Sequence, residues 1–229
     1  NIPENKLMVV FGESGCGKSH LIKLISQLKQ IDQEQIMSFL GYDSQSCEFD
    51  IASKDIKEMI DQIGIVQKKT TRPSRDGVED KPEIKEGMSF EEVEENDWKY
   101  TVFGNLYGFS KNEIDAILNS GDAMIIVNDI EIMRQLKQAY PKNFLPILIY
   151  RAANEEEWRN LMQQGNRSRE EIEKRAKQVG FSDQIYNEVF ELEIPEVIFN
   201  LPEKSLNKDL LLQLRRVITK KERENVLEK

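Results

Sequence analysis

The sequence predicts an α/β fold of three layers, with a parallel central sheet between two layers of helices. Continuous apolar runs at Leu7–Phe11, 123–127 and 145–150 predict strands buried on both faces, because such strands lack polar alternation. Segments with apolar residues at helical spacing separate these runs. Regular alternation of strand and helix is typical of a parallel sheet covered on both sides.

The remaining elements follow from local signals along the chain. A helix is expected from residue 19, where leucines and isoleucines recur at helical spacing through Leu28. Residues 31–60 read as irregular and polar, apart from one short helix near 54–60. Ser110 or Asn112 is expected to cap a helix that Gly121 stops. The other expected elements are strands at 63–66 and 197–199, and helices at 90–95, 128–140, 154–163, 168–178 and 205–220.

Composition excludes several classes of protein. The net charge of −9 argues against general nucleic-acid binding, which requires a basic face. Apolar runs fall short of the roughly 18 residues of a membrane span. Cys16 and Cys47 are too few for a disulfide framework and fit a reducing compartment, so we expect a cytoplasmic protein. We also expect a monomer or a homodimer.

A glycine-rich loop between the first strand and the first helix carries the strongest chemical signal. Residues 12–19 read GESGCGKS, which matches the phosphate-binding P-loop pattern in full. Backbone N–H groups and the helix dipole would hold the phosphates of ATP, Lys18 would serve the β- and γ-phosphates, and Ser19 would hold Mg²⁺. The predicted phosphate-binding residues are Gly12, Ser14, Gly15, Cys16, Gly17, Lys18 and Ser19, and they predict a P-loop NTPase fold.

Two further segments indicate which branch of the P-loop proteins is closest. Residues 70–75 read TTRPSR, and residues 103–108 read FGNLYG. With the P-loop, and in this order, they resemble the guanylate kinase family. The resemblance extends more weakly as far as Asn200, outside an apparent insertion at about 30–62.

The resemblance implies roles for individual residues. Arg72, Arg75 and Tyr107 match groups that bind the phosphate of the acceptor monophosphate, which suits the planar donors of arginine. Asp129 matches an aspartate near the metal and the acceptor. The resemblance also assigns Arg175 to the transferring phosphoryl group and Asn200 to the adenine of ATP.

Several positions depart from the family pattern. Trp98 stands where the family has a guanine-reading glutamate, with Asp97 beside it as a substitute reader. Phe109 replaces a base-contacting Ser or Thr, although Ser110 follows. Ile84 replaces a phosphate-binding tyrosine, and Val127 replaces the first aspartate of the middle strand. A lid arginine is replaced at Gln164, with Arg167 as a nearby candidate. We therefore expect phosphate recognition without strong guanine selectivity, with Trp98 and Phe109 free to stack a base or to border a sugar phosphate.

The resulting prediction is one guanylate kinase-like domain over 1–229. Its core would comprise about 1–66, 121–150 and 179–229, its acceptor lobe about 67–120, and its lid about 151–178. The expected activity is ATP-dependent phosphoryl transfer with Mg²⁺ to a small phosphorylated acceptor, GMP being favoured. Two alternatives stay open: another acceptor, such as a ribose phosphate, or a guanylate kinase-like protein-interaction module with little or no catalysis.

Overall fold

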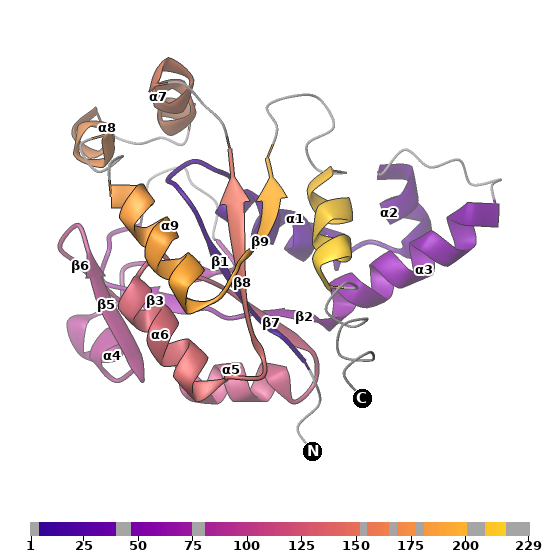
Figure 1. Ribbon diagram of the computed structural model, residues 1–229, viewed down its shortest axis with the longest axis horizontal. Coiled ribbons are helices and arrows are strands. Elements are labelled where there is room, and N and C mark those ends of the chain that lie inside the picture. The colour runs from indigo at the N-terminus through magenta and orange to yellow at the C-terminus, as the bar shows by residue number, and fades with distance from the viewer. Residues whose placement is uncertain are drawn as a thin grey trace.

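A five-stranded parallel sheet forms the centre of the molecule (Figure 1). The computed structural model describes residues 5–39, 47–74, 81–151, 155–164, 169–176, 181–200 and 209–218. The sheet has the order β2-β7-β1-β8-β9, and its neighbouring strands pair in parallel. The strands are β1 (Leu7–Phe11), β2 (Ile63–Ile65), β7 (Asp122–Ile126), β8 (Phe144–Tyr150) and β9 (Glu196–Phe199).

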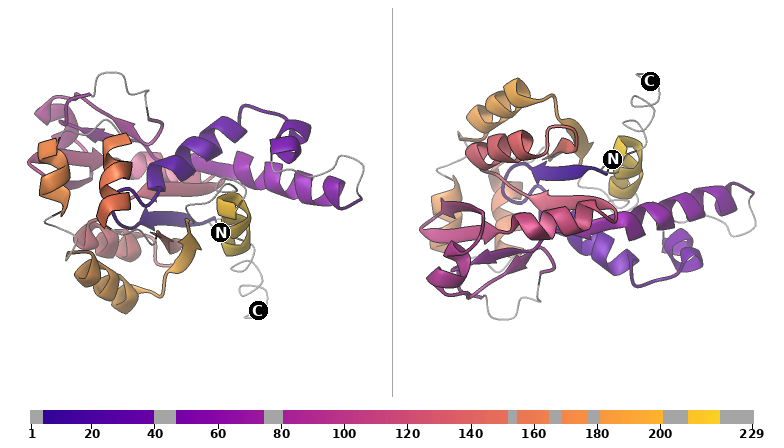
Figure 2. Two further views of the ribbon diagram at one scale, coloured as in Figure 1. Left: turned by 90° about the horizontal axis from the view of Figure 1, so that it is seen from above. Right: turned by 90° about the horizontal axis from the view of Figure 1, so that it is seen from below.

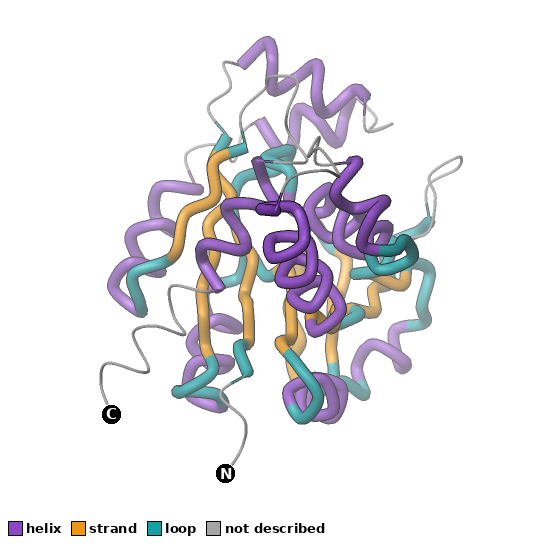
Figure 3. Tube along the Cα trace, turned by 90° about the vertical axis from the view of Figure 1, so that its right-hand side faces the viewer, coloured by secondary structure: helices purple, strands orange, loops and turns teal. Residues whose placement is uncertain are grey.

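Helices cover both faces of this sheet, as predicted (Figure 3). One face packs against α1 (Lys18–Leu28), α2 (Gln33–Phe39), α3 (Cys47–Gln62) and a helix over 209–218. The other face packs against α5 (Lys111–Leu118), α6 (Ile130–Ala139) and α9 (Phe181–Leu192). Alternate residues of β1 enter the two cores, with Met8 and Val10 on one side and Leu7 and Val9 on the other. Strand β1 is therefore apolar at every position.

A smaller mixed sheet lies between β2 and β7 in the sequence. Its order is β4-β3-β6-β5, made of β3 (Lys68–Thr70), β4 (Ile84–Lys85), β5 (Trp98–Val102) and β6 (Asn105–Phe109). The short helix α4 (Phe90–Glu94) begins at Ser89 with a complete capping box. The region predicted as the acceptor lobe, about 67–120, contains this sheet, α4 and also α5 (Lys111–Leu118). The region predicted as the lid forms α7 (Glu155–Gln164) and α8 (Arg169–Ala176).

The expectation for residues 31–60 is wrong. Instead of an irregular segment with one short helix, the chain forms α2 and the longer α3, which project from the side of the molecule opposite the small sheet (Figures 1 and 2). The two helices are stabilised by apolar residues that are scattered in the sequence but converge in space, among them Ile36, Met37, Ile56 and Ile60. Helix α9 is also absent from the predicted elements, although its Val189 is fully buried.

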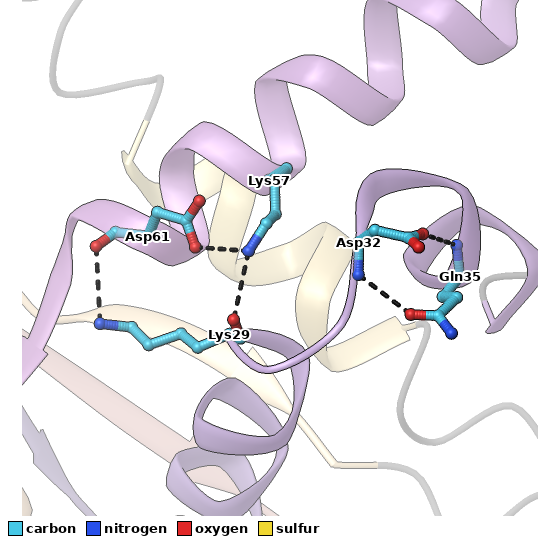
Figure 4. A network of polar contacts seen from close by, with 5 residues as sticks. All are labelled: Lys29, Asp32, Gln35, Lys57 and Asp61. Carbon is cyan, nitrogen blue, oxygen red and sulfur yellow. Dashed lines mark hydrogen bonds and ion pairs between the residues drawn. The ribbon is translucent and has the colours of Figure 1, made fainter.

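Polar contacts fix the arm formed by α2 and α3 to the end of α1 (Figure 4). Lys57 Nζ lies 2.7 Å from Asp61 Oδ1 and donates to Lys29 O at 3.3 Å. Asp32 and Gln35 exchange two hydrogen bonds at the start of α2, of 2.8 and 3.1 Å. Arg215 of the 209–218 helix pairs with Asp55 of α3 at 2.9 Å. Three segments distant in sequence are thereby held together around one core.

Candidate nucleotide and acceptor site

The glycine-rich loop follows β1 and leads directly into α1, as the motif requires. Gly12 has φ +141°, and a Cβ there would lie 2.4 Å from the carbonyl oxygen of Ile149. Gly17 has φ +108°, and a Cβ there would lie 2.3 Å from Asn200 Nδ2. L-residues rarely adopt these φ values, and neither position has space for a side chain. Both glycines are therefore required by the shape of the loop.

Asn128 holds the start of the loop through its side-chain amide. Its Oδ1 accepts from Gly12 N at 3.3 Å, and its Nδ2 donates to Gly12 O at 2.9 Å. The sequence analysis gave this residue no role. The available signal was its place as the first polar residue after β7, the strand that pairs with β1. Asn128 thus links the carboxyl ends of the two central strands.

Lys18 belongs to the first turn of α1, and its side chain extends back across the loop. Its ammonium donates to Gly12 O at 2.7 Å and to Glu13 O at 2.6 Å, and it lies 3.6 Å from Cys16 Sγ. The thiol of Cys16 is buried. Ser19 follows in the same turn of α1, and its side chain is exposed. The cation and the hydroxyl that the motif predicts are therefore adjacent at the amino end of α1.

Asn200 lies beneath the loop, at the end of β9. Its Nδ2 donates to Cys16 O at 2.6 Å, and the residue is 2% exposed. Its Oδ1 is buried and has no hydrogen-bond partner among the described contacts. Next to it, Tyr150 and Phe199 form an exposed edge-to-face aromatic pair at the ends of β8 and β9. A buried acceptor without a partner marks a place where a donor would be stabilised.

The region predicted as the lid contacts the loop directly. Trp158 of α7 donates from its indole Nε1 to Ser14 O at 2.9 Å, and its ring packs against Ile172 of α8. Arg159 and Glu173 join the two helices at 2.6 Å. Arg175 belongs to α8, but its side chain lies outside what the structure describes, and Arg167 and Arg75 also lie outside the described residues.

Arg72 of the small sheet has an unsatisfied guanidinium nitrogen. Its Nε lies 3.8 Å from Glu86 Oε1, longer than a hydrogen bond, and its buried Nη2 has no partner among the described contacts. Tyr107 of β6 is 9% exposed and stacks on Tyr100 of β5 with ring centroids 5.4 Å apart. The guanidinium of Arg72 thus has a donor that no described contact uses, whereas the ring of Tyr107 is mostly covered.

Lys68 of β3 carries a buried charge that the sequence analysis did not identify. The residue is 6% exposed, its Nζ donates to Ile126 O at 2.7 Å, and it lies 3.4 Å from the Tyr100 hydroxyl. Burial lowers the pKa of Lys68 to about 8, Glu83 opposes the shift, and the charges of Lys18 and Lys81 add to it. The P-loop lysine is therefore close enough to influence this ammonium.

The residues expected near a base have other roles in the structure. Trp98 and Phe109 are 7% and 1% exposed and stack on each other, with centroids 5.4 Å apart. The expectation that they border an open base site is wrong, because both rings belong to the core beneath the small sheet. Asp97 is exposed and accepts from Lys111 N at 2.7 Å, and Ser110 accepts from Asn112 N. Both side chains thus cap α5.

Asp129 occupies the N-cap of α6, where its Oδ1 accepts from Ile132 N at 3.0 Å. Burial raises the pKa of Tyr100, and the charges of Tyr107 and Asp129 raise it further. The carboxylate of Asp129 is therefore close to the half-buried Tyr100. It also follows Asn128, which holds the loop, so it lies at the junction of the loop and the small sheet.

Comparisons with known proteins agree with this architecture. A family model described as ABC transporter matches residues 1–192, so by sequence the chain belongs to that family of P-loop proteins. A curated guanylate kinase from Alkalilimnicola ehrlichii is 31% identical over 117 residues, which are 46% of this chain and 54% of the relative. The crystal structure of guanylate kinase from Anaplasma phagocytophilum matches with a TM-score of 0.51 at 12% identity, over 95% of this chain and 86% of that one.

The chain is a guanylate kinase-like P-loop protein. It spans about half the length of the curated relative it matches. The family model and the guanylate kinases have different descriptions but share the P-loop, and the architecture of the whole chain follows the guanylate kinase structure. In the part of the chain that the structure describes, no helix is long and apolar enough to cross a membrane.

Proposed function

We propose that this protein transfers the γ-phosphoryl group of ATP, with Mg²⁺, to a small phosphorylated acceptor. The observation that carries the proposal is the meeting of the phosphate loop and the small sheet at the carboxyl end of β7. There Asn128 holds Gly12, and two residues earlier Ile126 O accepts from Lys68. Phosphoryl transfer depends mainly on positioning and on neutralising charge, and this junction would bring donor and acceptor phosphates together.

The donor side uses the loop and the residues beneath it. Lys18 would exchange its contacts with loop carbonyls for the β- and γ-phosphates, and Ser19 would hold Mg²⁺ together with the phosphates. The described residues contain no cluster of three metal-ligating side chains, and a Mg²⁺ ion bound largely by phosphates does not need one. Asn200 Oδ1 accepts hydrogen bonds, so it favours the amino group of adenine over the carbonyl of guanine.

The acceptor side uses Arg72, with Arg75 and Tyr107 as further contacts to the acceptor phosphate. A phosphate oxygen of the acceptor would attack the γ-phosphorus, and the bond to the bridging oxygen would break with its electron pair leaving on ADP. Arg175 and Arg167 from the lid would neutralise the transferring group, and Asp129 would face the metal and the acceptor. GMP is the acceptor that the family suggests, but the buried rings of Trp98 and Phe109 favour weak guanine selectivity.

The test is ADP release measured with GMP, AMP and ribose phosphates, for the wild type and for Lys18→Ala and Arg72→Ala. We expect turnover with at least one acceptor, lost in Lys18→Ala and reduced by roughly tenfold or more in Arg72→Ala, because hydrogen bonds to charged groups contribute about 1.5–3 kcal/mol. Arg134→Ala is the matched control, since Arg134 pairs with Glu131 and Glu188 on α6 and α9. ATP binding without turnover on any acceptor would contradict the proposal and favour an interaction module.

A further inference from the structure

Strand β3 and the segments that flank β3 and β4 carry charged side chains that the hydrogen bonds of the small sheet do not satisfy. We define the lobe charge cluster as Lys68, Arg72, Lys81, Glu83 and Glu86. Glu83 is 3% exposed, and its Oε2 has no partner among the described contacts. Glu86 Oε1 likewise accepts no hydrogen bond, and its two cations, Arg72 and Lys81, lie at 3.8 and 4.0 Å. Buried charged groups this loosely paired are costly unless something else binds them.

Lys68 is the most deeply buried cation of the cluster. It donates to a main-chain oxygen, Ile126 O, and lies 6.0 Å from the centre of the Tyr107 ring. The structure records no ion pair for it within 4 Å in the described residues, although the charge of Glu83 acts on it from farther away. Its charge is therefore only partly compensated, and an anion within reach would be attracted strongly in this dry environment.

The neighbouring space contains stacked aromatic rings instead of base-reading groups. Tyr100 covers Tyr107, and Trp98 covers Phe109, with centroids 5.4 Å apart in each pair. A purine would have to separate these rings and would find neither a carboxylate at Trp98 nor a hydroxyl at Phe109. The group that the lobe adds is the buried ammonium of Lys68, four residues before Arg72 in the sequence, and an ammonium recognises an anionic or carbonyl oxygen.

We propose that the acceptor of this protein is a compact phosphorylated molecule with a second anionic group, not a purine nucleotide, and that Lys68 is the residue that selects it. Arg72 would bind the phosphate that receives the phosphoryl group, and Lys68 would bind the second anionic group. Glu83 and Glu86 would accept from hydroxyls between the two. This inference rests on the proposed function in taking the small sheet as the acceptor lobe.

Matched pairs of small molecules test the selection directly by calorimetry in the presence of a non-hydrolysable ATP analogue and Mg²⁺. The pairs are glycerol 3-phosphate against 3-phosphoglycerate, and ribose 5-phosphate against ribose 1,5-bisphosphate, with GMP as the reference. In at least one pair, we expect the molecule that has a second anionic group besides its phosphate to bind roughly tenfold or more tightly than its partner and than GMP. Equal affinity within both pairs, or tightest binding of GMP, would overturn the inference.

Variants of Lys68 show whether it is the selecting residue. Lys68→Met should abolish the preference within the pair, whereas Lys69→Met, one residue along the same strand, should leave it unchanged. Lys68→Arg keeps the positive charge, so it tests the role of Lys68 even where Lys68→Met fails to fold. In the wild type the preference should fall as the pH rises through about 8, because Lys68 loses its charge, and in Lys68→Arg it should not fall.

Other charged groups act on the same position, and the arginine comparison separates them from Lys68. The charges of Glu83, Lys81 and Lys18 act on the ammonium of Lys68, the hydroxyl of Tyr100 on β5 lies 3.4 Å from it, and the ring of Tyr107 on β6 lies 6.0 Å away. A pH dependence that persists in Lys68→Arg would assign the titration to one of these groups and overturn the role of Lys68. Selective binding without ADP release would support the acceptor class while contradicting phosphoryl transfer. ADP release with strict GMP preference would support phosphoryl transfer while contradicting the proposed acceptor class.

Discussion

Individual side chains carry most of the chemistry of this protein, and Lys18 is the first to test. Its ammonium donates to two loop carbonyls, at 2.6 and 2.7 Å, at the position where nucleotide phosphates are expected. We expect Lys18→Ala to weaken binding of Mg²⁺·ATP by about 1.5–3 kcal/mol, the usual contribution of a charged hydrogen bond. Calorimetry measures the loss, with Lys23→Ala on the same helix as the control. Unchanged affinity would contradict the assignment of the phosphate loop.

Lys68 of β3 links the small sheet to the stability of the whole chain. Its pKa of about 8 in the folded state lies below the value of 10.5 for a free lysine, so its charge is destabilising below pH 8. Between pH 8 and 10.5 the unfolded chain binds more protons than the folded one, so stability rises with pH. Relative to Lys68→Met, the wild type should gain up to about 3 kcal/mol across this window, at about 1.4 kcal/mol per pH unit.

Urea unfolding of both proteins at several pH values between 7.5 and 10 measures this gain. The subtraction removes groups common to the two, and Lys69→Met serves as the control on the same strand. Parallel stability curves for the wild type and Lys68→Met would show that the ammonium of Lys68 is not perturbed.

Two residues that were predicted to contact the acceptor, Ser110 and Asp97, cap helix α5. The hydroxyl of Ser110 and the carboxylate of Asp97 accept hydrogen bonds from the first backbone N–H groups of this helix. Ser110→Ala should cost about 1 kcal/mol of stability, as is usual for loss of a cap, and should leave acceptor affinity unchanged. Chemical denaturation and calorimetry measure the two effects, with Ser120→Ala at the other end of the helix as the control. A selective loss of acceptor affinity would instead restore the predicted role in binding.

At Asp129, the N-cap of α6, substitutions can distinguish the effect of helix capping from the effect of the negative charge. Asparagine caps helices about as well as aspartate, so Asp129→Asn should preserve the bond to Ile132 N and change stability by less than about 0.5 kcal/mol. The lost negative charge should lower ADP release, if Asp129 faces the metal as proposed. Asp129→Ala should lower both quantities. Equal rates of ADP release for the wild type and Asp129→Asn would exclude a role for the carboxylate in transfer.

At the same scale, the sequence predicted the elements whose signal is local and missed those that depend on distant partners. Strands β1, β7 and β8 are continuous apolar runs, and the P-loop is a contiguous motif, so both were predicted. Helices α2 and α3 were not, because their scattered apolar residues are buried partly by Leu210 and Leu214 from the far end of the chain. Asn128 and Trp158 were missed for the same reason, since their loop partners lie 116 and 144 residues away in the sequence.

At the scale of the molecule, the region predicted as the lid contacts the loop through Trp158, and we expect this region and the small sheet to move when nucleotide binds. Enclosing the reacting phosphates excludes water, and such lids are usually among the less stable parts of a fold. With a bisubstrate analogue, amide hydrogen exchange should slow in α7, α8 and residues 81–99, while exchange in β1 and β7 stays slow throughout. Lys18→Ala is the control for specific binding. Unchanged exchange in α7 and α8 would contradict closure.

The bond between Trp158 and the loop has an optical consequence. The sequence contains two tryptophans, and Trp98 is stacked on Phe109 in the core. In a Trp98→Phe variant, intrinsic fluorescence would come from Trp158 alone, whose indole N–H contacts the carbonyl of Ser14. Any nucleotide that rearranges the loop would change the solvent environment of that indole and shift its emission. The protein thus contains its own label-free reporter, so that candidate donors can be ranked by titration in a cuvette before any product is identified.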